Sequence, residues 1–324
     1  MDTAEPVGRR QSYRRSAWRV GLASSRPLYK GHMKDVTIGI KSFYRAPQLA
    51  ACLHALLELP IPEVIVADDG EIDAEKRAVY RAFNDRLPLR LLELEFDTGL
   101  SFGRNQIVRE SHTPYVLMLD DDQVVPPNIG ALRDILLTDR TLGGVSGYWL
   151  DGGRLRCTAC NLFETERYVI KDVGFRYRRQ TTGDLTYYRF DLIPNSTLFR
   201  IECLRQFPWD NYYKIAKEHL DFYLTHKRAK QWSFAVTPDV VIAHYPSTTD
   251  LRYIRDFRHN QERMRRSNEH FQRKWRKRGV IESLTLHEAF SLRHYLTHYA
   301  LAASPEAAGV VSWAGRIFAR MTGR

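Results

Sequence analysis

The chain has 324 residues, of which 44% are hydrophobic; this is enough for one substantial core and a smaller appendage, and it excludes a disordered chain. Its 49 basic and 38 acidic residues give a net charge of +11, which favours a polyanionic partner such as a nucleotide, an anionic lipid, an acidic glycan or nucleic acid. No stretch reaches about 18 uninterrupted apolar residues, and the basic segment 1–34 lacks the apolar run of a secretory signal. We therefore expect a cytoplasmic protein whose membrane contact, if it has one, is peripheral.

The four cysteines are Cys52, Cys157, Cys160 and Cys203. They are too few and too scattered for a disulfide framework, so we predict buried thiols in a reducing compartment. Cys157 and Cys160 form a CxxC pair. Without a second pair, or histidines at finger spacing, this pair does not predict a zinc site.

Apolar runs and helical patterns alternate in the first half of the chain, which is typical of a doubly wound, mostly parallel α/β sheet that begins near residue 35. The predicted strands are 36–40, 64–67, 89–94 and 115–119, and the predicted helices are 47–57, 74–83 and one that begins near Gly103 with Arg104 and Asn105 in its first turn.

The second half is less regular, and its character changes after Pro246. The segment 250–278 mixes arginines and lysines with aromatic residues, which predicts a basic amphipathic helix. We divide the chain into a flexible basic arm over 1–34, a folded α/β domain over 35–247 and a helical region over 248–324. The remaining predicted strands are 168–171, 196–200 and 234–242, and the remaining helices are 217–228, 284–303 and 307–321.

Acidic residues stand at the ends of two predicted strands. Because ligands of open α/β sheets bind outside the carboxyl ends of the strands, both groups point to one crevice. Adjacent carboxylates need solvent or a cation, and their oxygens suit Mg²⁺ or Mn²⁺, which can bridge donor phosphates. The alternative is an exposed acidic turn before a helix that starts at Pro126 and Pro127. The acidic residues are Asp68 and Asp69 after one strand, and Asp120, Asp121 and Asp122 after the other.

Other side chains complete this candidate site. His244 ends the strand 234–242 and offers a nitrogen ligand that manganese accepts, although a lone histidine there is usually structural. Arg104 and Asn105, near a helix amino terminus, suit a diphosphate. Glu218 and Asp221 share a helical face, where one can deprotonate an acceptor hydroxyl; the alternative is a solvated helix face.

The chain contains, in order, the run Val36–Ile40 followed by Lys41, Ser42, Phe43, Tyr44 and Arg45, the strand end Ala67–Asp69, the helix start Gly103–Asn105, and the motifs YVLMLDDD at 115–122, HLDF at 219–222 and VVIAH at 240–244. Over residues 35–247 this ordered set resembles the family 2 glycosyltransferases, and more specifically the ganglioside-type N-acetylgalactosaminyltransferases. The resemblance implies a GT-A fold, a Rossmann-like mixed sheet flanked by helices, to which the basic C-terminal helices are an extension.

The resemblance also implies roles for individual residues. It places the DxD carboxylates at Asp120 and Asp122, with Asp122 the closest ligand of Mn²⁺ or Mg²⁺ and His244 a further ligand. It places Asp68 at the uracil and Arg104 near the donor. The residues predicted to bind the donor are Lys41, Phe43, Arg45, Asp68, Asp69, Arg104, Asn105, Asp120 and Asp121.

At the base position many family 2 enzymes have Glu followed directly by Asp, whereas this chain has Glu218, His219 and then Asp221. We favour Asp221 as the base, with Glu218 as the alternative. The implied activity is inverting transfer of GalNAc, GlcNAc, Gal or Glc from a UDP-sugar to a hydroxyl of a glycan or lipid-linked acceptor, as in polysaccharide biosynthesis. The loop 152–183 and Asn195 are the candidates for contacts with the acceptor.

Two other functions compete with this interpretation. A sugar nucleotidyltransferase shares the sheet and the acidic site, but it usually has a glycine-rich phosphate loop, and Lys41–Arg45 contains no glycine. A nucleic-acid-binding protein accounts for the basic segment 252–278 and not for the acidic strand ends, so nucleic acid is the less favoured partner. Residues 250–324 either dock on an anionic membrane surface or pack over the core, and packing is slightly favoured.

Overall fold

The computed structural model describes residues 33–321 except 176, 247–252 and 287–290, with the side chains of 319–321 also excluded. The predicted basic arm over 1–34 therefore lies almost wholly outside the described residues. Of its last two residues, Met33 is buried in the core, so the core extends into the predicted arm.

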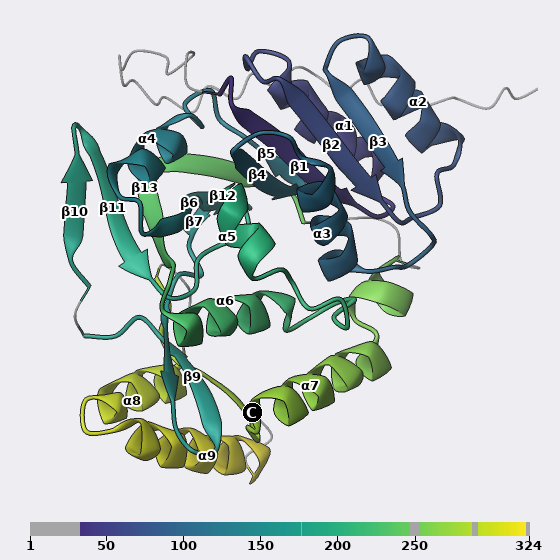
Figure 1. Cartoon of the computed structure of the whole chain (residues 1–324). Helices are drawn as coiled ribbons and strands as arrows, with labels where there is room; N and C mark the ends of the chain where they lie inside the picture. Colours follow the sequence, from purple (N-terminus) through teal and green to yellow (C-terminus); the bar gives the residue numbers. More distant parts are fainter. Residues whose placement is uncertain (1–32, 176, 247–252, 287–290, 322–324) are drawn as a thin grey trace, which may run out of the picture.

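A parallel sheet with covering helices forms the first half, as the alternating pattern predicts (Figure 1). β1 pairs in parallel with β2 on one side and with β4 on the other, and β3 extends the sheet beyond β2. The elements are β1 (Val36–Ser42), α1 (Ala46–Leu56), β2 (Glu63–Asp68), α2 (Ala74–Asn84), β3 (Leu89–Glu93), α3 (Leu100–Glu110) and β4 (Tyr115–Asp120).

Helix α3 begins at Leu100, earlier than predicted, so Arg104 and Asn105 lie in its second turn rather than its first. Gly99 precedes the helix with a φ of 100°, a conformation that glycine adopts without steric cost. Gly103 serves packing instead: a Cβ there would lie 2.4 Å from Lys41 Cδ.

The second half continues the same sheet with mixed strand directions. β12 is antiparallel to both β4 and β6, and β13 runs parallel to β6. The strand order is β10-β11-β13-β6-β12-β4-β1-β2-β3, with β5 on β13 and β7 on β6. The elements are β5 (Gln123–Val124), α4 (Ala131–Thr138), β6 (Leu142–Asp151), β7 (Arg154–Arg156), β10 (Arg179–Thr182), β11 (Leu185–Phe190), β12 (Thr197–Arg200), α5 (Ile201–Gln206), α6 (Glu218–Ala229) and β13 (Ser233–His244).

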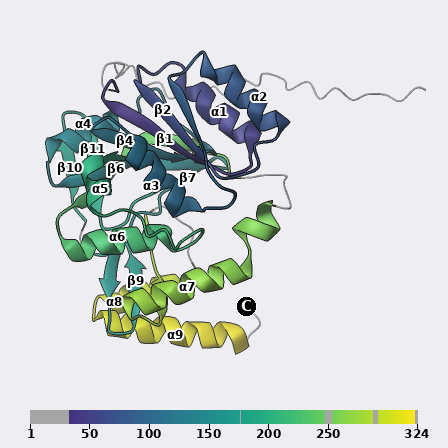
Figure 2. The ribbon, with the colours of Figure 1, turned by 45° about the vertical axis from the view of Figure 1, so that its right-hand side comes forward.

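Helices cover both faces of this sheet. Along β4, Leu117 and Leu119 point into the core under α1, α2 and α4, whereas Val116 and Met118 point into the core under α3, α5 and α6. This alternation gives a three-layer arrangement, which Figure 2 shows from a second direction. The four cysteines are buried and free.

The C-terminal region is joined to the core by a small second sheet. Its strands are β8 (Asn161–Glu164), β9 (Tyr168–Asp172) and β14 (Gly279–Glu282), with β14 parallel to β9. The predicted helix over 250–278 is a π-helical turn η1 (Tyr253–Arg258) followed by α7 (Gln261–Trp275). The last helices are α8 (Leu292–Leu301) and α9 (Pro305–Met321).

The prediction of a helix over 284–303 was too long at its amino end, because Ser291 caps α8 and starts it at Leu292. Among the described residues, no helix has the length and apolar character needed to span a bilayer.

Candidate active site

A cleft of about 550 Å³ opens where the carboxyl ends of β1 and β4 meet the amino end of α6. Residues from α3, from the end of β13 and from η1 complete its walls. The structure thus brings together side chains as far apart in the sequence as Lys41 and Glu282. The predicted site residues that line this cleft are Lys41, Phe43, Arg45, Arg104, Asp120, Asp122, Glu218 and His244.

The three adjacent aspartates have different surroundings. Asp121 is fully buried and accepts hydrogen bonds from Ser42 Oγ (3.0 Å) and the Phe43 amide (3.3 Å), besides an ion pair with Arg45. Burial, opposed by Arg45, raises the pKa of Asp121 to about 6. Asp121 therefore holds the β1–α1 loop and does not line the cleft.

Asp120 faces the cleft from the end of β4. Arg104 Nη2 donates to its carboxylate at 2.8 Å, and Asn195 donates to its other oxygen. Burial alone would raise the pKa of Asp120, but Arg104 brings the pKa below its usual value. The Asp120 carboxylate is thus ionised and already paired with the Arg104 guanidinium.

Asp122 has one paired and one free oxygen. Its Oδ2 accepts from Arg45 Nη1 at 2.5 Å and lies 3.6 Å from His244 Nε2. Its Oδ1 is buried and has no hydrogen-bond partner among the described residues. The alternative of an exposed acidic turn is wrong, because Asp121 and Asp122 are buried and α4 begins only at Ala131.

Arg45 supplies the positive charge that these carboxylates need. Its guanidinium bridges Asp121 and Asp122 and lies 5.4 Å from the ring centroid of Tyr253. Burial would lower the pKa of Arg45, but the two carboxylates raise it above its usual value. Tyr44 and Arg45 both have positive φ, 56° and 52°, which costs about 1–2 kcal/mol per residue.

The donor set fits a divalent cation in part. Within the described residues, no three histidine, cysteine, aspartate or glutamate side chains are grouped to hold a metal ion. The free Oδ1 of Asp122 and the nearby His244 imidazole are oxygen and nitrogen ligands of the kind that Mn²⁺ accepts. Arg45 occupies the other oxygen of Asp122, so the carboxylate shares its charge with the guanidinium.

Glu218 begins α6 and points its carboxyl group into the cleft. Its Oε1 lies 3.8 Å from Arg104 Nη1 and 3.7 Å from His219 Nε2, and its buried Oε2 has no hydrogen-bond partner among the described residues. Burial, opposed by Arg104, raises the pKa of Glu218. Burial lowers the pKa of His219 to about 3, so His219 is neutral at pH 7.

Arg104 connects the two sides of the cleft. It pairs with Asp120 and faces Glu218, and its guanidinium lies 5.9 Å from the ring centroid of Trp209. Nη1 and Nε are buried without hydrogen-bond partners among the described residues. This guanidinium retains donors for an anion that enters the cleft.

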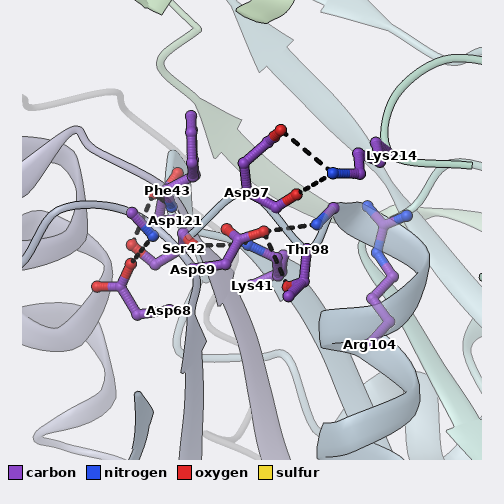
Figure 3. Close-up of polar contacts among 12 residues, drawn as sticks. Lys41, Ser42, Phe43, Asp68, Asp69, Asp97, Thr98, Arg104, Asp121 and Lys214 are labelled. Atoms are coloured by element: carbon purple, nitrogen blue, oxygen red, sulfur yellow. Dashed lines mark hydrogen bonds and ion pairs between the residues drawn. The ribbon is translucent and has the colours of Figure 1, made fainter. Parts of the chain in front are cut away.

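Asp68 and Asp69 lie beneath the cleft rather than in its wall. Asp68 accepts from Lys76 Nζ (2.8 Å), Gly70 N (3.0 Å) and the hydroxyl of Tyr80. Asp69 accepts from Gly99 N at 2.7 Å, and it also pairs with Lys41 (Figure 3). Both carboxylates therefore order the ends of β1 and β2.

Asp221 and Asn105 also point away from the cleft. Asp221 is buried and accepts from Lys274 Nζ (2.7 Å), Trp275 Nε1 (2.7 Å) and Tyr213 OH (3.2 Å). Asn105 donates to the carbonyl of Trp209 and accepts from its amide. The structure thus places Asp221 between α6 and α7, and it is not among the residues that line the cleft.

Several cleft residues belong to none of the sequence motifs, although Lys171 lies in the loop 152–183 that was predicted to contact the acceptor. Lys171 and Glu282, paired at 2.9 Å, reach the cleft from the small sheet. Tyr253, Arg258 and His259 reach it from η1 and the residue after it. Only the pairing of β14 with β9, and the packing of η1 beside Phe43, bring these residues to the site.

Comparison with known proteins gives a family match over part of the chain. Residues 37–143 match the family described as Glycosyl transferase family 2. The succinoglycan biosynthesis protein ExoU of Rhizobium meliloti is 36% identical over 101 residues, which are 30% of this chain and 29% of that protein. The chain thus matches less than a third of this curated relative.

Parts of the chain are similar to solved structures at low sequence identity. The crystal structure of GalNAc-T7 with UDP, GalNAc and Mn²⁺ gives a TM-score of 0.50 at 14% identity, covering 67% of this chain and 44% of that chain. Staphylococcus aureus TarS 1–349 in complex with UDP-GlcNAc gives 0.48 at 14% identity, covering 67% and 60%. The likeness to GalNAc-T7 confirms the predicted GT-A fold class. The resemblance to the ganglioside-type enzymes stays a prediction.

Proposed function

We propose that the chain is an inverting glycosyltransferase that moves a hexosyl or N-acetylhexosaminyl group from a UDP-sugar to a hydroxyl of a glycan or lipid-linked acceptor in polysaccharide biosynthesis. The family 2 match and the relative named for succinoglycan biosynthesis support the reaction class. One observation carries the proposal. Three residues that line one cleft each have a buried polar atom without a hydrogen-bond partner in the described structure: Asp122 Oδ1, Arg104 Nη1 and Glu218 Oε2.

The cationic side of the cleft suits the donor diphosphate. Arg104 has free donors, and Lys217 and Arg258 also line the cleft. A guanidinium binds phosphate oxygens through parallel N–H donors, which fixes the orientation of the leaving group as well as its charge. Arg104 is held in place by Asp120, so it requires little ordering when the donor binds.

Asp122, with Asp120 and His244, would hold a bound Mn²⁺ or Mg²⁺. Such an ion neutralises charge that develops on the departing diphosphate. The free Oδ1 of Asp122 would be its ligand oxygen, while Arg45 pairs with Oδ2 and with Asp121.

Glu218 is the proposed general base, in place of Asp221. Its raised pKa and its free Oε2 suit a carboxylate that accepts a proton from an acceptor hydroxyl. Asp221 has three donors and no access to the cleft. We therefore assign Asp221 a positioning role, in which it joins α6 to Lys274 and Trp275 of α7.

The basic helix α7 does not favour the nucleic-acid alternative. Arg263 pairs with Asp97 at 2.5 Å, and Lys274 pairs with both Asp210 and Asp221. Arg265 and Arg266 pair with Glu262 within the helix. Much of the charge of this segment is thus balanced inside the molecule.

The proposed activity is tested by incubating the full chain with a panel of UDP-sugars and measuring the release of UDP with MnCl₂, with MgCl₂ and with EDTA. We expect release from one or a few UDP-sugars that EDTA abolishes. A parallel reaction with UTP and sugar 1-phosphates measures pyrophosphate. Release of pyrophosphate without turnover of any UDP-sugar would instead identify a nucleotidyltransferase and contradict the proposal.

A further inference from the structure

The residue before α6 is a lysine of the cleft without an ionic partner. Lys217 lines the cleft beside Glu218, and within the described part of the chain its ammonium group has no hydrogen bond or ion pair. The cations deeper in the cleft differ from it, since Lys41, Arg45 and Arg104 each pair with an aspartate. Lys217 therefore keeps its charge available for a ligand.

Three charged residues of the cleft act on this ammonium group. Burial lowers the pKa of Lys217; Glu282 and Glu218 oppose this effect, whereas Lys171 adds to it. All three of these residues line the cleft, so the ammonium group lies among the groups that a ligand would meet. Lys217 thus extends the cationic lining of the cleft toward the small sheet.

The small sheet supplies the opposite part of this charged wall. Lys171 of β9 and Glu282 of β14 are partners in the strand register and form an ion pair at 2.9 Å. Figures 1 and 2 both show α6 between the large sheet and β9. Because Lys171 and Lys217 stand against Glu282 alone, this wall carries one positive charge in excess. Two like charges that are partly removed from water repel each other, and an anion would relieve the repulsion.

A strained turn fixes Lys217 in this place. Ala216 and Lys217 have φ angles of 60° and 67°, a left-handed conformation that costs about 1–2 kcal/mol per residue outside glycine. Ser267 Oγ of α7 donates to the Ile215 carbonyl at 2.6 Å, and the Asp221 amide donates to the Lys217 carbonyl at 2.8 Å. Such strain persists where the surroundings fix it, and it is concentrated at active and ligand-binding sites.

The position of Lys217 beside Glu218 favours the acceptor rather than the donor as its ligand. The guanidinium groups of Arg104 and Arg45 act on the donor-side carboxylate Asp120. The charges that act on Lys217 come instead from Glu218 and the small sheet. A general base lies within hydrogen-bond reach of the hydroxyl that it deprotonates, so groups that adjoin Glu218 on the side of the small sheet adjoin the acceptor sugar.

We propose that the acceptor is an acidic glycan and that Lys217 binds the carboxylate of the sugar that is glycosylated. This inference rests on the proposed function, because it takes Glu218 as the base. One carboxylate balances the single positive charge that Lys171, Lys217 and Glu282 leave. A sugar phosphate brings about two negative charges at pH 7, which exceeds this balance beside two glutamates. Lys171 also lies in the loop 152–183 that the sequence predicts to contact the acceptor.

The test is ligand-observed NMR titration of the full chain at saturating UDP and MgCl₂. The probes are the methyl glycosides of glucuronate, galacturonate and mannuronate, each beside its own methyl ester, which lacks only the charge. We expect at least one acid to bind about 10-fold more tightly than its ester, as a hydrogen-bonded charge pair provides. Equal binding of each acid and its ester, or no binding of any acid, would overturn the proposal.

The variant Lys217→Met removes the ammonium group and keeps an unbranched side chain. It should reduce the preference for the acid to less than about 2-fold, with the Kd for UDP unchanged. The matched control Lys214→Met removes a lysine of the same segment that pairs with Asp97, and it should keep the preference. A preference that survives in Lys217→Met would overturn the proposal, and so would a higher Kd for UDP, which would assign Lys217 to the donor.

A second variant predicts a change of the opposite sign. Glu282→Gln removes the carboxylate that balances the two lysines, so the acid should bind about 3-fold more tightly while the ester is unaffected. Weaker binding of the acid would contradict the charge balance. Glucose 6-phosphate should bind more weakly than the preferred acid, and the reverse order would overturn the assignment to a carboxylate. Release of UDP from UDP-sugars, measured on the same preparations, tests the proposed function separately.

Discussion

Glu218 and Asp221 lie one turn apart on α6, and their surroundings are opposite. Glu218 has a buried oxygen without a partner in the described structure and faces the cleft. Asp221 has donors from Tyr213, Lys274 and Trp275 and faces α7. A buried carboxylate with all its partners stabilises a fold, whereas one that lacks a partner costs stability and is free to act on a ligand.

The same contrast separates Asp122 from Asp69. Asp69 is held by Lys41, Thr98 and the Gly99 amide, whereas Asp122 keeps Oδ1 free. Four carboxylates that look alike in the sequence thus divide into two that we assign to chemistry and two that we assign to structure. The predictions below test this division.

Asp122→Asn should lower turnover strongly. Loss of one negative charge and of its cation-binding oxygen should lower kcat by about 10³-fold, equivalent to about 4 kcal/mol. Steady-state release of UDP measures this loss, with Asp139→Asn as the control. Asp139 pairs with Arg189 outside the cleft, and its loss should change kcat less than about 3-fold. Full metal-dependent turnover by Asp122→Asn would contradict the assignment of Asp122 to the chemistry.

Arg104→Lys should weaken donor binding. A lysine keeps the charge but cannot hold both Asp120 and a phosphate with parallel donors, so we expect a Kd for UDP about 10-fold higher, equivalent to about 1.4 kcal/mol. Isothermal titration calorimetry with UDP measures this Kd. Arg90→Lys, at the surface pair with Glu63 and Glu110, should leave the Kd unchanged. An unchanged Kd in Arg104→Lys would place the diphosphate elsewhere.

Asp221→Asn should act on stability. The variant leaves Lys274 without one of its two ion-pair partners and weakens two hydrogen bonds, so we expect the free energy of unfolding to fall by about 1–3 kcal/mol. Urea denaturation at pH 7 measures the change. Unaltered stability together with loss of turnover would mean that Asp221 acts in the chemistry.

Glu218→Gln should have a small effect on stability, of the opposite sign. Burial raises the pKa of Glu218 in the folded protein, so the folded state binds this proton more tightly than the unfolded chain does. The free energy of unfolding of the wild type therefore falls as pH rises through the pKa of Glu218 in the folded state. This loss is absent below the pKa of Glu218 in the unfolded state. The neutral variant should be more stable at pH 8 by about 0.5–2 kcal/mol, and the gain should disappear at low pH. A loss of stability at pH 8 would contradict this.

The sequence was sufficient to predict the strands that consist of uninterrupted apolar runs. β2 and β4 follow this rule. β13 was predicted from two apolar runs on either side of Thr237, Pro238 and Asp239. β6 was not predicted because Gly143, Gly144 and Gly147 dilute its pattern. Packing accounts for these glycines: a Cβ on Gly144 would lie 2.7 Å from Phe199, and one on Gly147 would lie 2.6 Å from the Val240 carbonyl.

The sequence predicted where the site residues lie on the strands and helices better than it predicted the contacts that surround each of them. The carboxyl ends of strands located Asp120 and Asp122, and helical spacing placed Glu218 and Asp221 near each other. The sequence could not predict which carboxylate a distant segment buries, because Lys274 and Trp275 follow Asp221 by more than fifty residues. The position of Arg45 between two aspartates depends on a left-handed turn that the residue types do not favour.

The most direct test is the kcat for sugar transfer of Glu218→Gln beside that of Asp221→Asn, measured at saturating donor and acceptor on folded protein. If Glu218 is the base, Glu218→Gln should lower kcat by about 10²- to 10⁴-fold with little change in the donor KM, while Asp221→Asn stays within about 10-fold of the wild type. A Glu218→Gln variant that keeps wild-type kcat, or an Asp221→Asn variant that loses more than Glu218→Gln, would contradict the assignment.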